Sequence, residues 1–259
     1  MAVIAVFNQK GGVGKTTTTL NLLAALNRAG QRPIAVDLDP QSHLTLSLGA
    51  PPPTAEDSVS AFFRGNRALA DLVRELPGGV RLIPSHMELS KVDALFGKSI
   101  SIARRLREGM QESFAREPAP KLIDCCPMLG VLSLNAVFAA DRVLIPVSAD
   151  FLSMQGVHRL DAALRVLEGP LKRRIARKVV VTRFDSRRKL SYDIFDKLKE
   201  VFGDDLCHTR IAENVSLAES PAQGKDVFAH APHSQGAKDY QALAEELSAA
   251  GFFGPAPGG

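Results

Sequence analysis

The chain has 259 residues, 45% hydrophobic and 23% charged, a balance that excludes a disordered or fibrous protein. No apolar run reaches the roughly 20 residues that cross a membrane, and the amino terminus lacks a signal peptide, so we expect a cytoplasmic protein. The net charge of +4 and the pI near 9.0 permit an anionic partner without requiring one.

Apolar, strand-like runs alternate with helical patterns along the chain. The predicted strands cover residues 3–7, 33–37, 80–84, 121–124, 142–147 and 178–182. The predicted helices cover residues 17–29, 68–75, 100–116, 132–139, 154–167 and 192–202. Because the strands are continuously apolar, we predict an α/β fold: a single doubly wound, mainly parallel sheet with helices on both faces. Such a sheet binds its ligand at the carboxyl ends of its strands.

A glycine-rich loop follows the first predicted strand directly and opens the first predicted helix. Its glycines allow backbone N–H groups to turn towards anionic oxygens, and the helix N-terminus adds partial positive charge. Lys15 can reach terminal phosphates, and the Thr16 hydroxyl is placed to bind Mg²⁺. The predicted phosphate-binding residues are Gly11, Gly12, Val13, Gly14, Lys15, Thr16 and Thr17.

The loop departs from the usual phosphate-binding pattern, in which a glycine would occupy the position of Gln9. A second lysine, Lys10, stands in the loop and has no obvious phosphate to contact within its own subunit. One use for it is to reach a nucleotide held by a second copy of the protein. The simpler alternative is a solvated surface lysine in a glycine-rich turn.

Aspartates end two of the predicted strands and complete the candidate site. Asp39 is the candidate for ordering the attacking water, because the following Pro40 predicts an extended exit from the strand. Asp124 closes another apolar run, where phosphate-loop enzymes place a carboxylate that holds Mg²⁺. Each aspartate taken alone could equally cap a turn, but two beside a phosphate loop favour the functional interpretation.

The motifs together resemble the ParA/MinD family of deviant Walker A ATPases, and most closely its ParA-type partition and positioning members. The likeness covers nearly the whole chain, so we expect an ATPase domain at residues 1–253 and a disordered tail at 254–259. It is carried by the segments 10–17, 37–41, 124–127, 134–136, 140–147, 181–185, 214–224 and 237–247.

The resemblance implies a role for each matching residue. Lys10 would cross a nucleotide-sandwich dimer to the partner's phosphates, and Lys15 would bind phosphate in its own subunit. Asp39 would position or activate the attacking water. Thr182 and Arg183 would line the adenine pocket. The implied cofactors are ATP and Mg²⁺, with the metal at Thr16, Asp39 and Asp124.

The resemblance also implies partners: an ATP-dependent homodimer, nonspecific DNA, and an activating protein that stimulates a weak basal hydrolysis. Two basic clusters could neutralise DNA phosphates, at residues 172–178 and 183–189, although each could be only a solvated surface. A membrane partner is not expected, because Glu245 and Glu246 replace the basic residues of a lipid-binding tail. The protein would then be cytoplasmic, with association with the nucleoid as a further expectation.

The sequence departs from the family pattern at two places. Cys125-Cys126 stands in the loop after Asp124, where relatives have Asp-x-Pro-Pro, so this loop is expected to be less rigid. Glu213 replaces a common basic residue and weakens the case for DNA binding there. The alternatives left open are a MinD-like membrane-associated ATPase, a cofactor-assembly ATPase, and an ATP-binding module with negligible turnover.

Overall fold

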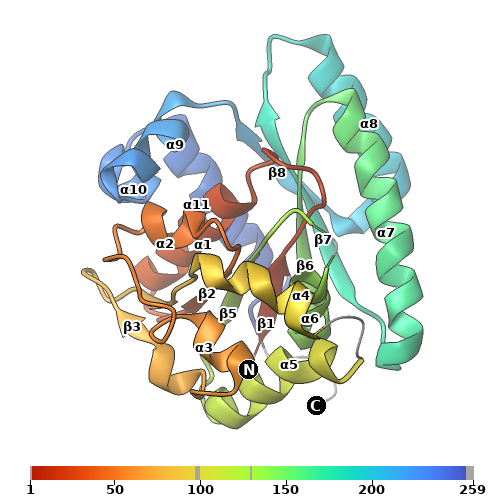
Figure 1. The fold of residues 1–259 in the computed structure, drawn as a ribbon. Coiled ribbons are helices and arrows are strands. Elements are labelled where there is room, and N and C mark those ends of the chain that lie inside the picture. Colours follow the sequence, from red (N-terminus) through yellow and green to blue (C-terminus); the bar gives the residue numbers. More distant parts are fainter. Residues whose placement is uncertain (1, 97–99, 129, 255–259) are drawn as a thin grey trace.

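The computed structural model describes residues 2–96, 100–128 and 130–254, and they form one eight-stranded sheet between two layers of helices (Figure 1). The strand order is β3-β4-β2-β5-β1-β6-β7-β8, and only the β3–β4 pair is antiparallel. The strands are β1 Val3–Val6, β2 Ile34–Leu38, β3 Arg74–Glu75, β4 Arg81–Ile83, β5 Lys121–Cys125, β6 Arg142–Ser148, β7 Ala176–Phe184 and β8 Leu206–Ala212. The predicted doubly wound, mainly parallel α/β fold is confirmed.

Helices connect the strands and cover both faces of the sheet. The longer ones are α1 Lys15–Arg28, α5 Ile100–Phe114, α6 Val131–Ala139, α7 Phe151–Leu171, α8 Lys189–Phe202 and α11 Gln235–Ala249. The short ones are α2 His43–Ser47, α3 Val59–Arg64, α4 Lys91–Phe96, α9 Val215–Glu219 and α10 Val227–His230, with 3₁₀ turns η1 Ala70–Leu72, η2 Met87–Ser90, η3 Gly203–Asp205 and η4 Ser220–Gln223. None of the helices in the described part of the chain has the length and apolar character needed to cross a bilayer.

Alternate residues of β1 point into two separate cores. Val3 and Ala5 pack in the larger core with α3, α5, α6, α7 and α8, whereas Ile4 and Val6 pack with α1, α10 and α11. This alternation follows from the strand geometry, in which successive side chains leave opposite faces. Both faces are therefore buried, as the continuous apolar runs predicted.

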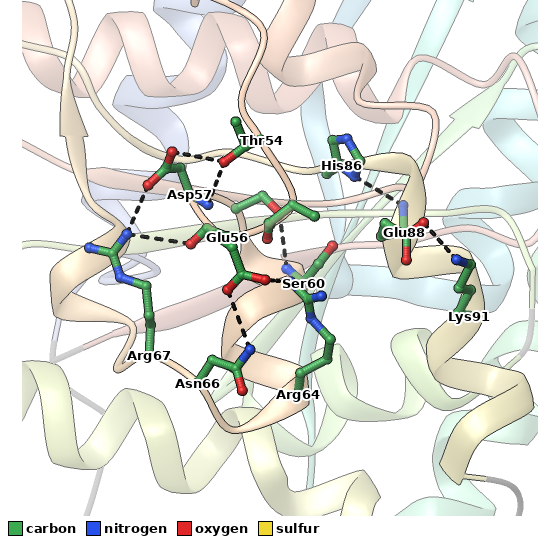
Figure 2. A network of polar contacts seen from close by, with 12 residues as sticks. Thr54, Glu56, Asp57, Ser60, Arg64, Asn66, Arg67, His86, Glu88 and Lys91 are labelled. Carbon is green, nitrogen blue, oxygen red and sulfur yellow. Dashed lines mark hydrogen bonds and ion pairs between the residues drawn. The ribbon is translucent and has the colours of Figure 1, made fainter.

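The six predicted strands and five of the six helices predicted from the residue pattern agree with the structure, but the helix predicted at residues 68–75 is wrong. The helix that the resemblance implied at residues 237–247 is also present, as α11. Only the turn η1 and the strand β3 form there. Figure 2 shows Arg67 reaching back to Asp57 (2.9 Å) and to the carbonyl of Glu56. The same guanidinium donates a hydrogen bond to the Asp71 carbonyl at 2.8 Å. This bond competes with the backbone hydrogen bond that the carbonyl would accept in a continuing helix.

A hairpin signal after this segment was missed. Gly78 and Gly79 both have positive φ (83° and 80°) and connect the short antiparallel strands β3 and β4. The Leu76 N–H donates to the Val80 carbonyl at 2.7 Å and closes the turn. Adjacent glycines between two short runs are a turn signal, but a strand of two residues is too short to show periodicity.

The edge strand β8, which was not predicted, is covered by α11. The Glu246 carboxylate accepts hydrogen bonds from the His208 and Thr209 amides (2.7 and 2.8 Å), and Asp239 accepts from Ala212 (2.8 Å). Carboxylates on α11 thus satisfy donors that an open sheet edge would leave unpaired. The boundary predicted at residue 253 stays a prediction, and residues 255–259 of the predicted tail lie outside the described residues.

Candidate nucleotide site

The loop between β1 and α1 presents an open helix N-terminus at the carboxyl edge of the sheet. Gly12 and Gly14 adopt φ values of 73° and 84°, a region that residues with a side chain rarely enter. Gly14 is the N-cap of α1, where no side chain caps the helix and no acidic residue lies in the first turn. The first amides of a helix lack intrahelical acceptors, so this end is suited to an anion.

Lys15 lies at the base of this loop. Its Nζ atom donates to the Lys10 carbonyl at 3.0 Å, and the residue is only 7% exposed. Burial lowers the pKa of the Lys15 amine, and the nearby Asp124 and Asp39 carboxylates counter this effect only in part. Because this amine is largely removed from water, a phosphate group bound beside it would stabilise its charged form through charge-assisted hydrogen bonds.

Thr16 and Asp124 meet directly beneath the loop. The Thr16 hydroxyl donates to Asp124 Oδ2 at 2.8 Å, and the Thr19 hydroxyl donates to Oδ1 at 3.1 Å. Thr16 was predicted to bind Mg²⁺, whereas Thr19 was not identified from the sequence. Its position one helical turn after Lys15 was the only signal available.

Two buried carboxylates lie next to each other because β2 and β5 are paired in register at Asp37 and Asp124. Burial, together with the neighbouring charge of Asp37, raises the pKa of Asp124 to about 8. Burial likewise raises the pKa of Asp37 to about 6, although Thr45 donates two hydrogen bonds to it. A cation bound at this point would stabilise the charged form of both carboxylates.

The protein groups fit Mg²⁺, a metal that keeps several waters and is usually held by one or two carboxylates and by phosphates. Thr16 and Asp124 are already in contact, and Thr16 and Asp39 line one cavity. Within residues 2–96, 100–128 and 130–254, no three His, Cys, Asp or Glu side chains form a metal cluster on their own. A metal here would therefore depend on phosphate oxygens for part of its coordination.

Asp39 lies just beyond β2 and lines a cavity of about 900 Å³ with Gly11, Gly12, Gly14, Lys15, Thr16 and Thr17. The predicted extended exit after Asp39 is wrong. The Ser42 amide donates to the Asp39 carbonyl at 2.8 Å and closes a turn with Pro40 at its second position, where the fixed φ of proline is favoured. The Ser85 hydroxyl donates to the same carbonyl at 2.7 Å, which holds this turn against the sheet.

A second cavity, of about 350 Å³, opens on the other side of the loop. Thr182 and Arg183 line it, as the adenine-pocket prediction requires, together with Gly12, Gly14, Thr17, Ile211, Glu213, Asn214 and Tyr240. The Thr182 hydroxyl donates to the Val13 carbonyl at 2.9 Å and ties β7 to the loop. Arg183 has a positive φ of 51° and pairs with Glu213 at 3.4 Å.

The Lys10 side chain forms an ion pair with Asp150, whereas its backbone carbonyl accepts the Lys15 amine. The Lys10 ammonium group binds both oxygens of Asp150, at 2.7 and 2.9 Å, beyond the carboxyl end of β6. The side chains of Lys10 and Asp150 remain 34% and 44% exposed. Asp150 was not identified from the sequence, because only the packing of β6 beside β1 brings it to the loop.

The structure thus brings most of the predicted residues together in two cavities that share Gly12, Gly14 and Thr17. Lys10, Val13 and Asp124 are not among the residues that line these two cavities. An AAA domain family model matches residues 1–176. Sporulation initiation inhibitor protein Soj of Bacillus subtilis is 34% identical over 251 residues, covering 96% of this chain and 99% of Soj. Chromosome-partitioning ATPase Soj of Thermus thermophilus is 38% identical over 248 residues, covering 95% of each chain.

This chain is a ParA/MinD-family ATPase. Among solved structures, the ATPase resembles cobyrinic acid a,c-diamide synthase from Mycobacterium smegmatis with bound ATP analog and magnesium, with a TM-score of 0.83, 27% identity and 99% coverage of both chains. It shares the fold of a Cyanothece McdA variant in complex with ATP (TM-score 0.85, 24% identity, 96% coverage of both chains). It also shares the fold of septum site-determining protein MinD with Mg-ADP from Pyrococcus horikoshii OT3, with a TM-score of 0.77, 22% identity, and coverage of 97% and 98%.

Proposed function

We propose that this ATPase is a positioning switch that dimerises with ATP, binds DNA nonspecifically and is reset by hydrolysis. Its cargo would be a plasmid, a chromosome or a protein cluster, and a partner protein would stimulate a weak basal hydrolysis. Chromosome partitioning protein ParA of Caulobacter vibrioides, 34% identical with 95% of this chain and 94% of ParA covered, supports the partition role.

The open loop fits a nucleoside triphosphate with Mg²⁺. The amides at the start of α1 and the Lys15 amine would bind the phosphates, and Thr16 and Asp124 would hold the metal, with Asp39 alongside. Mg²⁺ supplies neutralisation of the charge on the phosphate oxygens. The base would enter the cavity beside Thr182 and Arg183. Bound ATP analog and magnesium in the M. smegmatis synthase structure support this assignment.

Hydrolysis would use Asp39, whose position beside Lys15 and Thr16 suits a group that orients the attacking water. Asp39 is 8% exposed and lines the same cavity as Lys15 and Thr16, so water can reach it there. The Asp39 turn is held by Ser85 and by the Asp37 carboxylate, which accepts the Asp39 amide at 3.1 Å. This support would keep the carboxylate aimed at the phosphate.

The observation that carries the dimer is the position of Lys10. Its ammonium is bound by Asp150 outside the cradle, while the cradle already contains Lys15. A second copy facing the loop would bring a triphosphate, and so a stronger anion than one carboxylate, to the exposed side of Lys10. A cation supplied in trans to a transferring phosphoryl group contributes roughly 10³–10⁵ in rate in other enzymes.

Gel filtration with light scattering tests this proposal. The Asp39→Ala variant should retain ATP and run as a dimer with ATP and Mg²⁺, but as a monomer with ADP. Adding Lys10→Gln to Asp39→Ala should abolish the dimer, whereas Lys199→Gln, an exposed control on α8, should not. A dimer that survives the loss of Lys10, or an Asp39→Ala protein that stays monomeric with ATP, contradicts the switch.

The packing of α11 supports DNA rather than a membrane as the surface on which the switch acts. Its apolar residues Leu243 and Leu247 are buried in the core, and Phe252 and Phe253 just beyond the helix are buried with them. This face would have to leave the core before it could enter a lipid interface.

The resemblance to the M. smegmatis synthase keeps a cofactor-assembly enzyme as the second candidate. The two functions differ in the phosphoryl acceptor, which is water for the switch and a carboxylate substrate for a diamide synthase. Phosphate release that rises with DNA and an activating protein favours the switch. Release that needs a small carboxylic acid and an amine donor favours the synthase.

A further inference from the structure

One ion pair borders the cavity that lies beside the phosphate loop. This is the cavity of about 350 Å³ described above, here called the base cavity, and the pair is Arg183 with Glu213, here called the clip; both residues line the cavity. Arg183 Nη2 lies 3.4 Å from Glu213 Oε1, and Arg183 Nη1 donates to the Gly12 carbonyl at 3.5 Å. The guanidinium therefore reaches from β7 to the phosphate loop and to the turn after β8.

The backbone of β7 is irregular where it presents Arg183. Val181 pairs with Arg210 and Phe184 pairs with Ala212, so three steps along β7 match two steps along β8. This irregularity coincides with the positive φ of Arg183 (51°), a conformation that residues with a side chain rarely adopt. Bulges of this kind re-aim side chains beside functional sites, and the associated strain persists only where surrounding contacts hold it.

Backbone contacts hold the clip, whereas its side chains are loosely paired. The Thr182 hydroxyl donates to the Val13 carbonyl at 2.9 Å, and the Glu213 amide donates to the Phe184 carbonyl at 3.1 Å. The side chains of Arg183 and Glu213 remain 59% and 52% exposed, and their separation of 3.4 Å exceeds that of a strong charge-assisted hydrogen bond. The two side chains can therefore separate to admit a ligand without disturbing the strands.

The base cavity is otherwise mostly apolar. Ile211, Leu217 and Ala218 line it, and Val215, which lines it too, is 71% exposed. A purine ring would cover this apolar surface, and its π face attracts a guanidinium placed over it. Arginine is suited to such a contact because its planar, delocalised cation stacks on aromatic faces.

We infer that the clip closes over the bound base and slows the release of nucleotide: Arg183 stacks on the purine, and Glu213 holds the guanidinium in place. The inference rests on the proposed function, which puts the base in this cavity, and it adds a control on the rate at which ADP leaves the switch. Glu213 acts through Arg183 and is therefore a positioning residue. Because stacking uses the ring face rather than the base edge, the clip should act alike on adenine and guanine nucleotides.

Stopped-flow release of an ADP analogue labelled on the ribose, chased with excess ADP and Mg²⁺, tests the clip. Arg183→Gln should release the analogue about 3- to 30-fold faster, the range expected for a lost cation–π contact. Glu213→Gln should increase the rate less, by about 2- to 5-fold, the range of an exposed ion pair. The double variant should match Arg183→Gln alone, because Glu213 acts only through Arg183.

The matched control is Arg64→Gln, which breaks an exposed ion pair with Glu56 beside α3 and should leave the release rate unchanged (Figure 2). Inorganic tripolyphosphate with Mg²⁺ gives the second readout, because it occupies the phosphate loop but has no base. Its inhibition constant, measured by competition with the same analogue, should be equal in the parent and in all the clip variants. Equal values would show that the phosphate loop is undisturbed and that the clip acts on the base.

Release of the analogue at the parent rate by Arg183→Gln would overturn the inference and leave the proposed function intact. Weaker binding of tripolyphosphate by the clip variants would also overturn it, because the clip would then support the phosphate loop rather than the base. If the parent protein binds tripolyphosphate as tightly as ATP, the base makes no useful contact, and its position in the proposed function is itself wrong.

Discussion

At the carboxyl end of β5 the buried ionisable group is an acid, Asp124, whereas at the amino end of the same strand it is a cation, Lys121. The contrast extends across the sheet. Asp37 lies beside Asp124, and Arg142 lies with Lys121 at the opposite edge, where its guanidinium donates to the Gly254 carbonyl at 2.7 Å. The buried ionisable residues of β2, β5 and β6 therefore have opposite charges at the two ends of their strands.

The chain direction explains this arrangement. In a βαβ unit the helices run antiparallel to the strands, so helix N-termini gather at the carboxyl edge and helix C-termini at the amino edge. Acids complement the free amides at the first edge: Asp37 accepts the Asp39 and Thr45 amides. At the second edge, Lys121 donates to the Glu117 and Ala119 carbonyls, both at 2.7 Å, in the loop that follows α5.

The compensation of buried charge is incomplete at both edges. Burial raises the pKa of Asp124 to about 8 and lowers the pKa of Lys121 to about 8. Each group thus gains by meeting an opposite charge. The carboxyl edge has a cavity where such a ligand can enter, whereas Lys121 is fully enclosed and its cost persists in the folded protein.

The largest expected effect comes from a substitution at the carboxyl edge of the sheet. Lys15→Met should weaken ATP binding by roughly 10²–10³-fold, because the charge-assisted contact with phosphate is lost. The thermal midpoint without nucleotide should stay equal or rise, because burial lowers the pKa of the Lys15 amine and methionine removes that cost. Titration calorimetry and differential scanning fluorimetry measure the two quantities. A fall of several degrees without nucleotide would mean that Lys15 stabilises the empty fold.

The next effect concerns the amino edge. Arg177→Met should lower the free energy of unfolding by about 3 kcal/mol, because Asp161 and Glu168 lose a buried partner. Urea denaturation measures the change. Arg174→Met, at an exposed neighbouring position, is the matched control and should change stability by less than about 0.5 kcal/mol. Equal effects at the two positions would contradict the importance of the buried pair.

The pH dependence of stability sharpens the comparison at Lys121. Its pKa is lowered from 10.5 to about 8, so the unfolded state binds more protons than the folded state between these values, and stability rises with pH there. The full cost, about 3 kcal/mol, applies below pH 8. Lys121→Met should therefore exceed the parent in stability most at pH 7, and this advantage should shrink by pH 10.

Urea denaturation at several pH values gives this difference directly, because other titrating groups cancel between the two proteins. Lys197→Met, exposed on α8, is the control and should show no such pH dependence. An advantage of Lys121→Met that stays constant from pH 7 to 10 would place the pKa of Lys121 at its ordinary value.

The smallest effect concerns Asp124. Its raised pKa means that the cost of the buried acid is absent below pH 4 and grows as the pH rises towards 8. Asp124→Asn should therefore stabilise the nucleotide-free protein at pH 7, but only by about 1 to 2 kcal/mol, because the amide nitrogen cannot accept the hydrogen bond that one of the two threonines donates. Mg²⁺ should no longer strengthen ATP binding. Denaturation without nucleotide and calorimetry with and without Mg²⁺ test both parts, with the exposed Asp196→Asn as control.

Local patterns were sufficient for most of the fold. The strands β1, β2, β5 and β6 are continuous apolar runs, so neither the neighbouring helices nor the sheet order was needed to recognise them. The helix predicted at residues 68–75 is absent because the Arg67 side chain donates a hydrogen bond to the Asp71 carbonyl in that segment. This contact depends on where the side chain lies in the folded protein. The strand β8 was missed because it carries exposed polar residues such as His208 and Arg210.

For the site, the sequence alone determined the phosphate loop, because the glycines, Lys15 and Thr16 act within one short segment whose geometry is local. Only the tertiary structure decided the partners that lie far away in the chain: Asp150 on Lys10, and Glu213 on Arg183. Charge interactions depend on distance in space and on burial, and neither quantity is encoded in the spacing of residues along the sequence.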